Sequence, residues 1–163
     1  MKKLIILAMC VSLMACVDNG GAKTNLEGKI IPDFKFKLLD SSTYLKTINL
    51  AHNKPFILFF YSPHCPYCRK QTELMLKSMN KLDSTKIYML TSFSIKEAKS
   101  FSSEYNLTKY PNIISGIDSL DIIRHYYKAP GIPYLAIYDK SSKLRKTFLG
   151  KVEIDKLENS LQE

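Results

Sequence analysis

The stretch FFYSPHCPYCRKQ (59–71) decides the fold, because a strand, a pair of cysteines and the start of a helix follow one another within it. It begins inside the apolar run FILFFY (56–61), and such runs suit a central strand that is covered on both faces. Cys65 and Cys68 come next, with two residues between them. Pro66 fits the first position of a helix, where the N–H that proline lacks has no helical partner in any case. The segment therefore predicts two cysteines where a buried strand meets a helix N-terminus.

The rest of the chain predicts strands that alternate with helices. Strands are expected at 34–38, 56–61, 86–93, 133–139 and 143–149, and helices at 66–82, 94–107, 120–127 and 152–163. Ser94 and Glu97 form the pattern of a capping box. This alternation indicates βαβ units, and the last two strands add an antiparallel edge. The 163 residues thus predict one α/β domain, a mixed central sheet flanked by helices.

The N-terminus carries the features of an export signal. Lys2 and Lys3 precede an apolar run at 4–15, which is shorter than the roughly 20 residues that span a bilayer. The sequence LMAC (13–16) resembles a bacterial lipobox, in which cleavage precedes a cysteine that then carries lipid. The alternatives are an ordinary signal peptide that is cut nearby, or an uncleaved anchor. The expected parts are a signal peptide at 1–15, lipidation at Cys16, a flexible polar tether at 16–29 and a domain at 30–163.

Cysteine usage separates the pair from the other cysteines. Of the four cysteines, Cys10 leaves with the signal peptide and Cys16 is capped by lipid, so the domain keeps Cys65 and Cys68. Outside the cytoplasm a close pair is either a disulfide or a redox-active dithiol. The pair closes too small a loop to be a major stabilising cross-link. A redox dithiol is therefore favoured over a purely structural disulfide.

The position of the pair explains why two residues separate the cysteines. A helix N-terminus presents free N–H groups and the positive end of the helix dipole. Both favour the thiolate form of Cys65, which is the form that attacks a disulfide. Cys68 lies one turn further along and can attack the mixed disulfide formed on Cys65. The spacing predicts Cys65 as the nucleophile and Cys68 as the resolving cysteine.

A metal site is the other chemistry that two cysteines can support. A closed zinc site needs four ligands, and the chain offers only three histidines, of which His64 alone lies near the pair. Two soft sulfurs beside a histidine could also hold Cu(I). The redox dithiol is favoured over both kinds of metal site, so no metal is expected at the pair.

Three segments resemble the thioredoxin superfamily, in particular the membrane-tethered, extracytoplasmic thiol–disulfide oxidoreductases of bacteria. They are IIPDFKFKLLD (30–40), KPFILFFYSPHCPYC (54–68) and GIPYLAIYD (131–139). The resemblance implies a thioredoxin-like fold with an extra N-terminal strand region. It also implies a cis Ile132–Pro133 bond against the dithiol, with the backbone of Ile132 pairing with an extended substrate strand. The active-site loop would comprise His64, Pro66 and Tyr67. CPYC also occurs in glutaredoxins, but the N-terminal strands and the lipobox do not fit that family.

Several positions depart from the pattern of that family. His64 stands where a tryptophan is common, and Phe59 stands where thioredoxins often have a buried acid. Gln71 and Glu73 stand where members with a reductase role often have glutamate and proline. The usual carboxylate that relays a proton to Cys68 is therefore missing, and only Glu73 or a water is a candidate for that role.

We therefore expect an exported, membrane-anchored lipoprotein that faces the periplasm or the cell exterior and reduces disulfides of protein clients. A disulfide oxidase or isomerase of the same fold, or a non-catalytic copper-binding or surface lipoprotein, is the alternative. The expected partners are client proteins and a membrane protein that donates or accepts electrons. No cofactor is expected, since the electrons reside on sulfur. The net charge of +9 comes from dispersed lysines, which favours a solvated basic surface over nucleic-acid binding.

Overall fold

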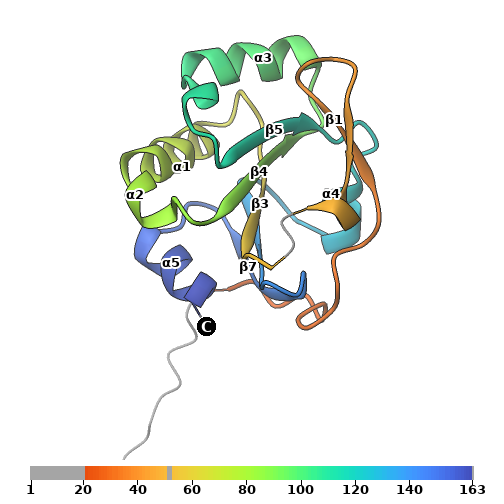
Figure 1. Ribbon diagram of the computed structural model, residues 1–163, viewed down its shortest axis with the longest axis vertical. Coiled ribbons are helices and arrows are strands. Elements are labelled where there is room, and N and C mark those ends of the chain that lie inside the picture. Colours follow the sequence, from red (N-terminus) through yellow and green to blue (C-terminus); the bar gives the residue numbers. More distant parts are fainter. Residues whose placement is uncertain (1–20, 51–52, 163) are drawn as a thin grey trace, which may run out of the picture.

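A single mixed sheet forms the centre of the protein in the computed structural model, which describes residues 21–50 and 53–162 (Figure 1). The strands are β1 (Lys35–Leu38), β2 (Tyr44–Lys46), β3 (Phe56–Phe60), β4 (Lys86–Thr91), β5 (Ile113–Ile117), β6 (Tyr134–Tyr138) and β7 (Leu144–Leu149). The α-helices are α1 (Pro66–Lys77), α2 (Met79–Leu82), α3 (Ile95–Glu104), α4 (Ile122–Tyr127) and α5 (Ile154–Gln162). Two 3-10 turns are η1 (Thr47–Asn49) and η2 (Leu107–Lys109).

Strand β3 lies near the middle of the sheet, whose order is β2-β1-β5-β4-β3-β6-β7. It pairs in parallel with β4 and antiparallel with β6, and all its residues are buried. Strand β5 pairs in parallel with β4, whereas β1 and β7 add antiparallel partners at the two sides. The predicted mixed sheet with a fully covered central strand is therefore confirmed.

Helices cover both faces of this sheet. Successive residues of β3 point to opposite sides and so contribute to two separate apolar clusters. Ile57 and Phe59 pack on one side in a cluster that also contains residues of α1, α3 and α5. Leu58 and Phe60 pack on the other side, where α4 and the segment around β1 supply the partners. Figure 1 shows α1, α2, α3 and α5 on one side of the strands and α4 on the other. Two layers of helices thus enclose the strand that leads to the cysteine pair.

All four predicted helices are shorter in the structure than expected, and two of them end clearly earlier. The helix expected at 66–82 is interrupted at Ser78, whose N–H donates to the carbonyls of both Leu74 and Met75 and closes α1. The helix expected at 94–107 ends at Glu104, because Asn106 adopts a left-handed conformation with φ of 48°. The capping box of Ser94 and Glu97 at its start is confirmed.

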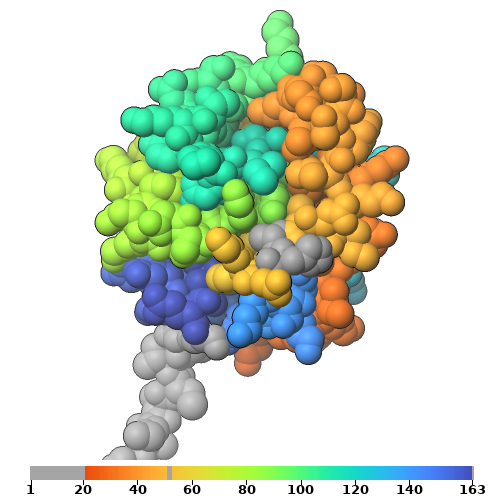
Figure 2. All heavy atoms as spheres, in the orientation of Figure 1, coloured from red at the N-terminus to blue at the C-terminus, as the bar shows by residue number. Residues whose placement is uncertain are grey.

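The expected signal peptide at 1–15 and the lipidation site Cys16 lie outside the described residues. The described part of the expected tether does not extend freely, since it lies along β7. Ala22 N–H donates to Thr147 O at 2.9 Å and Gly28 N–H to Leu144 O at 2.7 Å. An edge strand offers unpaired backbone groups, and residues 22–29 use those of β7. Figure 2 shows these orange residues beside the blue residues that follow β6.

None of the helices within the described residues is long and apolar enough to cross a membrane. The domain boundary expected at residue 30 remains a prediction from the sequence. The lipid anchor that would precede it also remains a prediction.

Candidate active site around Cys65 and Cys68

The two cysteines lie where the chain leaves the central strand and enters α1. Tyr61 N–H donates to Leu90 O at 3.0 Å and so continues the pairing of β3 with β4. Cys65 is the N-cap residue of α1 and has an extended backbone conformation. Pro66 occupies the first turn, where the sequence predicts it. The end of a buried strand thus fixes Cys65 at the N-terminus of a helix, as expected.

The two thiols have different environments although they belong to one short motif. Both cysteines are free thiols, but Cys65 is partly exposed whereas Cys68 is fully buried. Burial raises the pKa of Cys68, and the backbone N–H of Ser62 offsets only part of this effect. The neighbouring Cys65 side chain raises the pKa of Cys68 further. A partner can therefore reach the first sulfur, while the second is kept as a neutral, enclosed thiol.

The loop before β6 lies beside this pair. The Ile132–Pro133 peptide bond is cis, as the family resemblance implies. The carbonyl oxygen of Ile132 lies 3.9 Å from Cys65 Sγ and is placed to accept a weak hydrogen bond from it. Among the described residues, no group accepts a hydrogen bond from the N–H of Ile132. The structure thus brings Ile132 to Cys65 from a segment far away in sequence.

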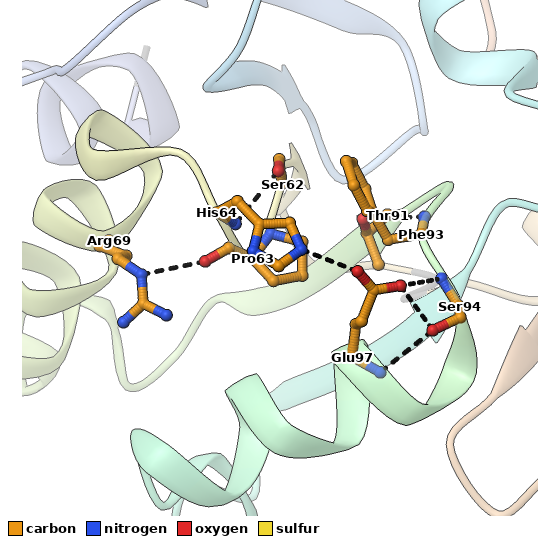
Figure 3. Close-up of polar contacts among 8 residues, drawn as sticks. All are labelled: Ser62, Pro63, His64, Arg69, Thr91, Phe93, Ser94 and Glu97. Carbon is orange, nitrogen blue, oxygen red and sulfur yellow. Dashed lines mark hydrogen bonds and ion pairs between the residues drawn. The ribbon is translucent and has the colours of Figure 1, made fainter.

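His64 interacts with α3 rather than with the cysteines. Its Nε2 lies 2.7 Å from Glu97 Oε1, and its ring contacts the Phe93 ring edge-on, with centroids 5.4 Å apart (Figure 3). The pKa of Glu97 is lowered to about 2, mainly by the Ser94 hydroxyl and then by His64. The sequence identifies Glu97 only as a capping residue, and no spacing indicates that it reaches the active-site loop.

Arg69 of α1 supports the same loop from the other side. Its Nε donates to the carbonyl oxygen of Pro63 at 2.9 Å (Figure 3). Its guanidinium also forms an ion pair with Glu104. The N–H of His64 donates to Ser62 Oγ at 3.2 Å. The residues that precede Cys65 are therefore held by both α1 and α3.

The positions that depart from the family pattern are accounted for by packing. Phe59 lies in the apolar core, where a charged side chain would lack a partner. Gln71 is fully buried, and its Oε1 accepts a hydrogen bond from Val152 N–H at 2.7 Å. Glu73 forms an exposed ion pair with Lys70, and no hydrogen bond among the described residues joins it to Cys68. Glu73 is thus engaged with Lys70, and its role as the base for Cys68 stays a prediction.

Two tyrosines complete the surroundings of the pair. Tyr67, between the cysteines, exposes 66% of its surface and is available to contact a partner. Tyr61 is buried, and desolvation, with a smaller effect of Cys68, raises its pKa. Its hydroxyl has no hydrogen-bond partner in the described structure. Sequence analysis did not single out Tyr61, because it ends an apolar run without any motif of its own.

Metal-binding geometry is not found in the described ranges. No group of three or more His, Cys, Asp or Glu side chains there could hold a metal ion. The histidine nearest the cysteines is His64, and its Nε2 is bound to Glu97. The arrangement instead places one accessible sulfur and one buried sulfur in a position to exchange with a disulfide.

Comparisons with known proteins agree with this architecture. A family profile described as a thioredoxin-like domain matches residues 44–163. At the level of sequence, no curated protein matches the chain. Several solved structures, each less than 25% identical, share its fold.

One similar structure is a secreted disulfide oxidoreductase of Mycobacterium tuberculosis, with 19% identity and a TM-score of 0.65; it covers 79% of this chain and 94% of its own. The thioredoxin domain of a thiol–disulfide oxidoreductase of Bacteroides vulgatus has 19% identity and a TM-score of 0.65, and the match covers 83% of this chain and 95% of that domain's chain. StoA of Bacillus subtilis has 18% identity and a TM-score of 0.60, and the match covers 79% of this chain and 96% of the StoA chain.

Proposed function

Since the chain belongs to the thioredoxin-like domain family, we propose that it is a thiol–disulfide oxidoreductase that reduces disulfides of protein clients. The observation that carries this proposal is the contrast between the two cysteines at the N-terminus of α1. Cys65 is partly exposed at the N-cap of α1, whereas Cys68 is buried as a thiol. This is the division of roles that a two-step exchange needs.

The reaction proceeds through one mixed disulfide. The Cys65 thiolate attacks one sulfur of the client disulfide, the client S–S bond breaks, and the other client sulfur leaves as a thiolate. Cys68 then loses its proton and attacks Cys65 Sγ, which releases the second client sulfur. Two electrons and two protons pass to the client, and the protein is left with a Cys65–Cys68 disulfide.

The Ile132–Pro133 loop provides the place for an extended client segment. The N–H of Ile132 is without a partner among the described residues and lies on the loop next to Cys65. A client strand could pair with this backbone while its own sulfur meets Cys65. Tyr67 and His64, both well exposed, border the same site.

The cellular location and the direction of electron transfer also form part of the proposal. The N-terminal sequence supports export, lipidation at Cys16 and a location at the periplasm or the cell exterior. A relative of this fold is described as secreted. Because the medium there is oxidising, a membrane protein would have to reduce the Cys65–Cys68 disulfide after each cycle.

The proposal is tested with a disulfide reduction assay on a protein substrate. We expect Cys65→Ser to abolish turnover and Cys68→Ser to accumulate mixed disulfides, which a non-reducing gel with mass spectrometry detects. Unchanged turnover in either variant would contradict the mechanism.

The reduction potential of the Cys65–Cys68 pair then tests the direction of electron transfer. A value near that of thioredoxin, about −270 mV, supports a reductase, whereas a value near about −120 mV identifies an oxidase instead.

A further inference from the structure

The side chain next to the nucleophile is fixed although it is exposed. His64 precedes Cys65 directly, and 64% of its side chain is accessible to solvent. Its ring is nevertheless held at two points, by Glu97 Oε1 at 2.7 Å from Nε2 and by the edge-on ring of Phe93. Figure 3 shows the ring directed toward the start of α3. Without these two contacts, an exposed histidine side chain in this position could adopt other rotamers and reach other partners.

Glu97 is itself fixed before it meets His64. Its Oε2 accepts a hydrogen bond from Ser94 N–H at 3.0 Å and a second from the Ser94 hydroxyl. The pKa of Glu97 is lowered to about 2, so the carboxylate carries its charge at neutral pH. The capping box thus aims a permanent negative charge at the histidine beside the nucleophile.

The natural alternative partner of His64 is the Cys65 sulfur. A histidine that pairs with a cysteine stabilises its thiolate, as in enzymes with a Cys–His pair. Here no hydrogen bond in the described part of the chain joins the His64 ring to Cys65, whose Sγ is instead near Ile132 O. We propose that Glu97 is a positioning residue that holds His64 toward α3 and withholds its ring from the Cys65 thiolate.

This role sets the redox equilibrium and rests on the proposed function. A better-stabilised thiolate stabilises the dithiol form and makes the protein more oxidising. By withholding His64, Glu97 keeps the dithiol a better electron donor. The relevant equilibrium converts protein dithiol and glutathione disulfide into protein disulfide and two glutathione thiols, so two electrons and two protons are exchanged.

The test measures this equilibrium in glutathione buffers by thiol trapping. Glu97→Gln removes the charge but keeps the capping box, which accepts glutamine as well. We expect it to shift the equilibrium toward the protein dithiol by about two- to fivefold, the range of exposed ion pairs. That change raises the reduction potential by roughly 9 to 21 mV. Glutamine can still accept a hydrogen bond from His64, although without the charge of the carboxylate. Glu97→Ala, which cannot accept any, should therefore shift the equilibrium in the same direction and further.

Two controls separate positioning from a general effect of charge or stability. In a His64→Ala background, Glu97→Gln should cause no further shift, because the ring it controls is gone. Asp155→Asn removes another exposed carboxylate, which pairs with Lys81 at 2.6 Å and does not touch the active-site loop. This variant should leave the equilibrium unchanged.

Other outcomes overturn the inference. An unshifted equilibrium in Glu97→Ala, a shift toward the disulfide in either variant, or a shift that persists without His64 each refutes the role of Glu97. A wild-type pair that does not exchange with glutathione refutes the proposed function itself, so the two failures are distinguishable.

Discussion

At the residue scale, the chemistry of the site depends on how differently neighbouring side chains are buried. Cys65 and Cys68 are separated by two residues, yet only the first meets solvent. Sequence spacing predicts their roles, because a helix places the second cysteine one turn deeper. It does not predict that Glu97, far along the chain, binds the residue next to Cys65.

The difference between the thiols has a direct consequence for alkylation. With reduced protein at neutral pH, we expect iodoacetamide to label Cys65 and leave Cys68 unmodified, because burial raises the pKa of Cys68 and blocks access. Mass spectrometry of the peptides measures both sites. In urea the two should react alike, and equal labelling of the folded protein would contradict the burial of Cys68.

Glu97 makes the stability of the folded protein depend on pH in the acidic range. Its pKa lies near 2 in the folded protein against 4.5 for an unperturbed group, so its contribution to stability is complete above about pH 4.5 and is lost as pH falls through about 2. Glu97→Gln should therefore flatten the decline of stability in this window. Urea unfolding at several pH values measures it.

The source of this effect is tested by two further variants. Ser94→Ala should flatten the decline more than His64→Ala, because the Ser94 hydroxyl is the largest cause of the shift. The same decline in Glu97→Gln and wild type would show that the carboxylate is not linked to folding.

At the scale of the element, strands with a strong apolar pattern were predictable and short or glycine-containing ones were not. Strand β3 was identified from its apolar run, whereas β2 has three residues and no such pattern. Strand β5 is not among the strands that the sequence predicts. It contains Gly116, where an added Cβ would lie 2.6 Å from Phe36 Cδ2 of β1. Its place between β1 and β4 therefore depends on a close approach that the sequence does not reveal.

Helix α1 is joined to the segment just before α5 by a buried hydrogen bond, from Val152 N–H to Gln71 Oε1. Gln71→Ala should lower the free energy of unfolding by about 1–3 kcal/mol, because a buried N–H loses its partner. Chemical denaturation measures the change. Thr72→Val is the matched control, since among the residues that the structure describes the Thr72 hydroxyl bonds only within α1, to Cys68 O. An equal loss in both variants would contradict a special role for this link.

At the scale of the whole molecule, the N-terminal segment covers one edge of the sheet. Residues 22–29 donate and accept backbone hydrogen bonds along β7, where a flexible tether was expected. No local pattern indicates this pairing, because the segment is polar and contains glycine. What makes it bind is the free edge of β7, which exists only once the sheet has formed.

Removal of residues 1–29 should expose this edge. We expect the truncated domain to stay folded but to unfold at lower urea concentration and to self-associate more readily. Urea unfolding and light scattering measure the two effects. Thr147→Val, which removes the side-chain hydrogen bond to Ala22 O and leaves the backbone hydrogen bonds of the segment in place, should have a smaller effect. An unchanged midpoint in the truncated protein would show that the segment contributes nothing to stability.

The sequence by itself determined the parts that depend on neighbouring residues. These are the apolar strand, the proline that opens α1, the cysteine spacing and the capping box of α3, all of which follow from interactions within a few positions. The tertiary structure alone decided which distant groups meet. Glu97 reaches His64, Gln71 reaches Val152 and the N-terminal segment reaches β7 because the order of strands brings separate segments together. No local pattern encodes that order, since it results from the packing of the whole chain.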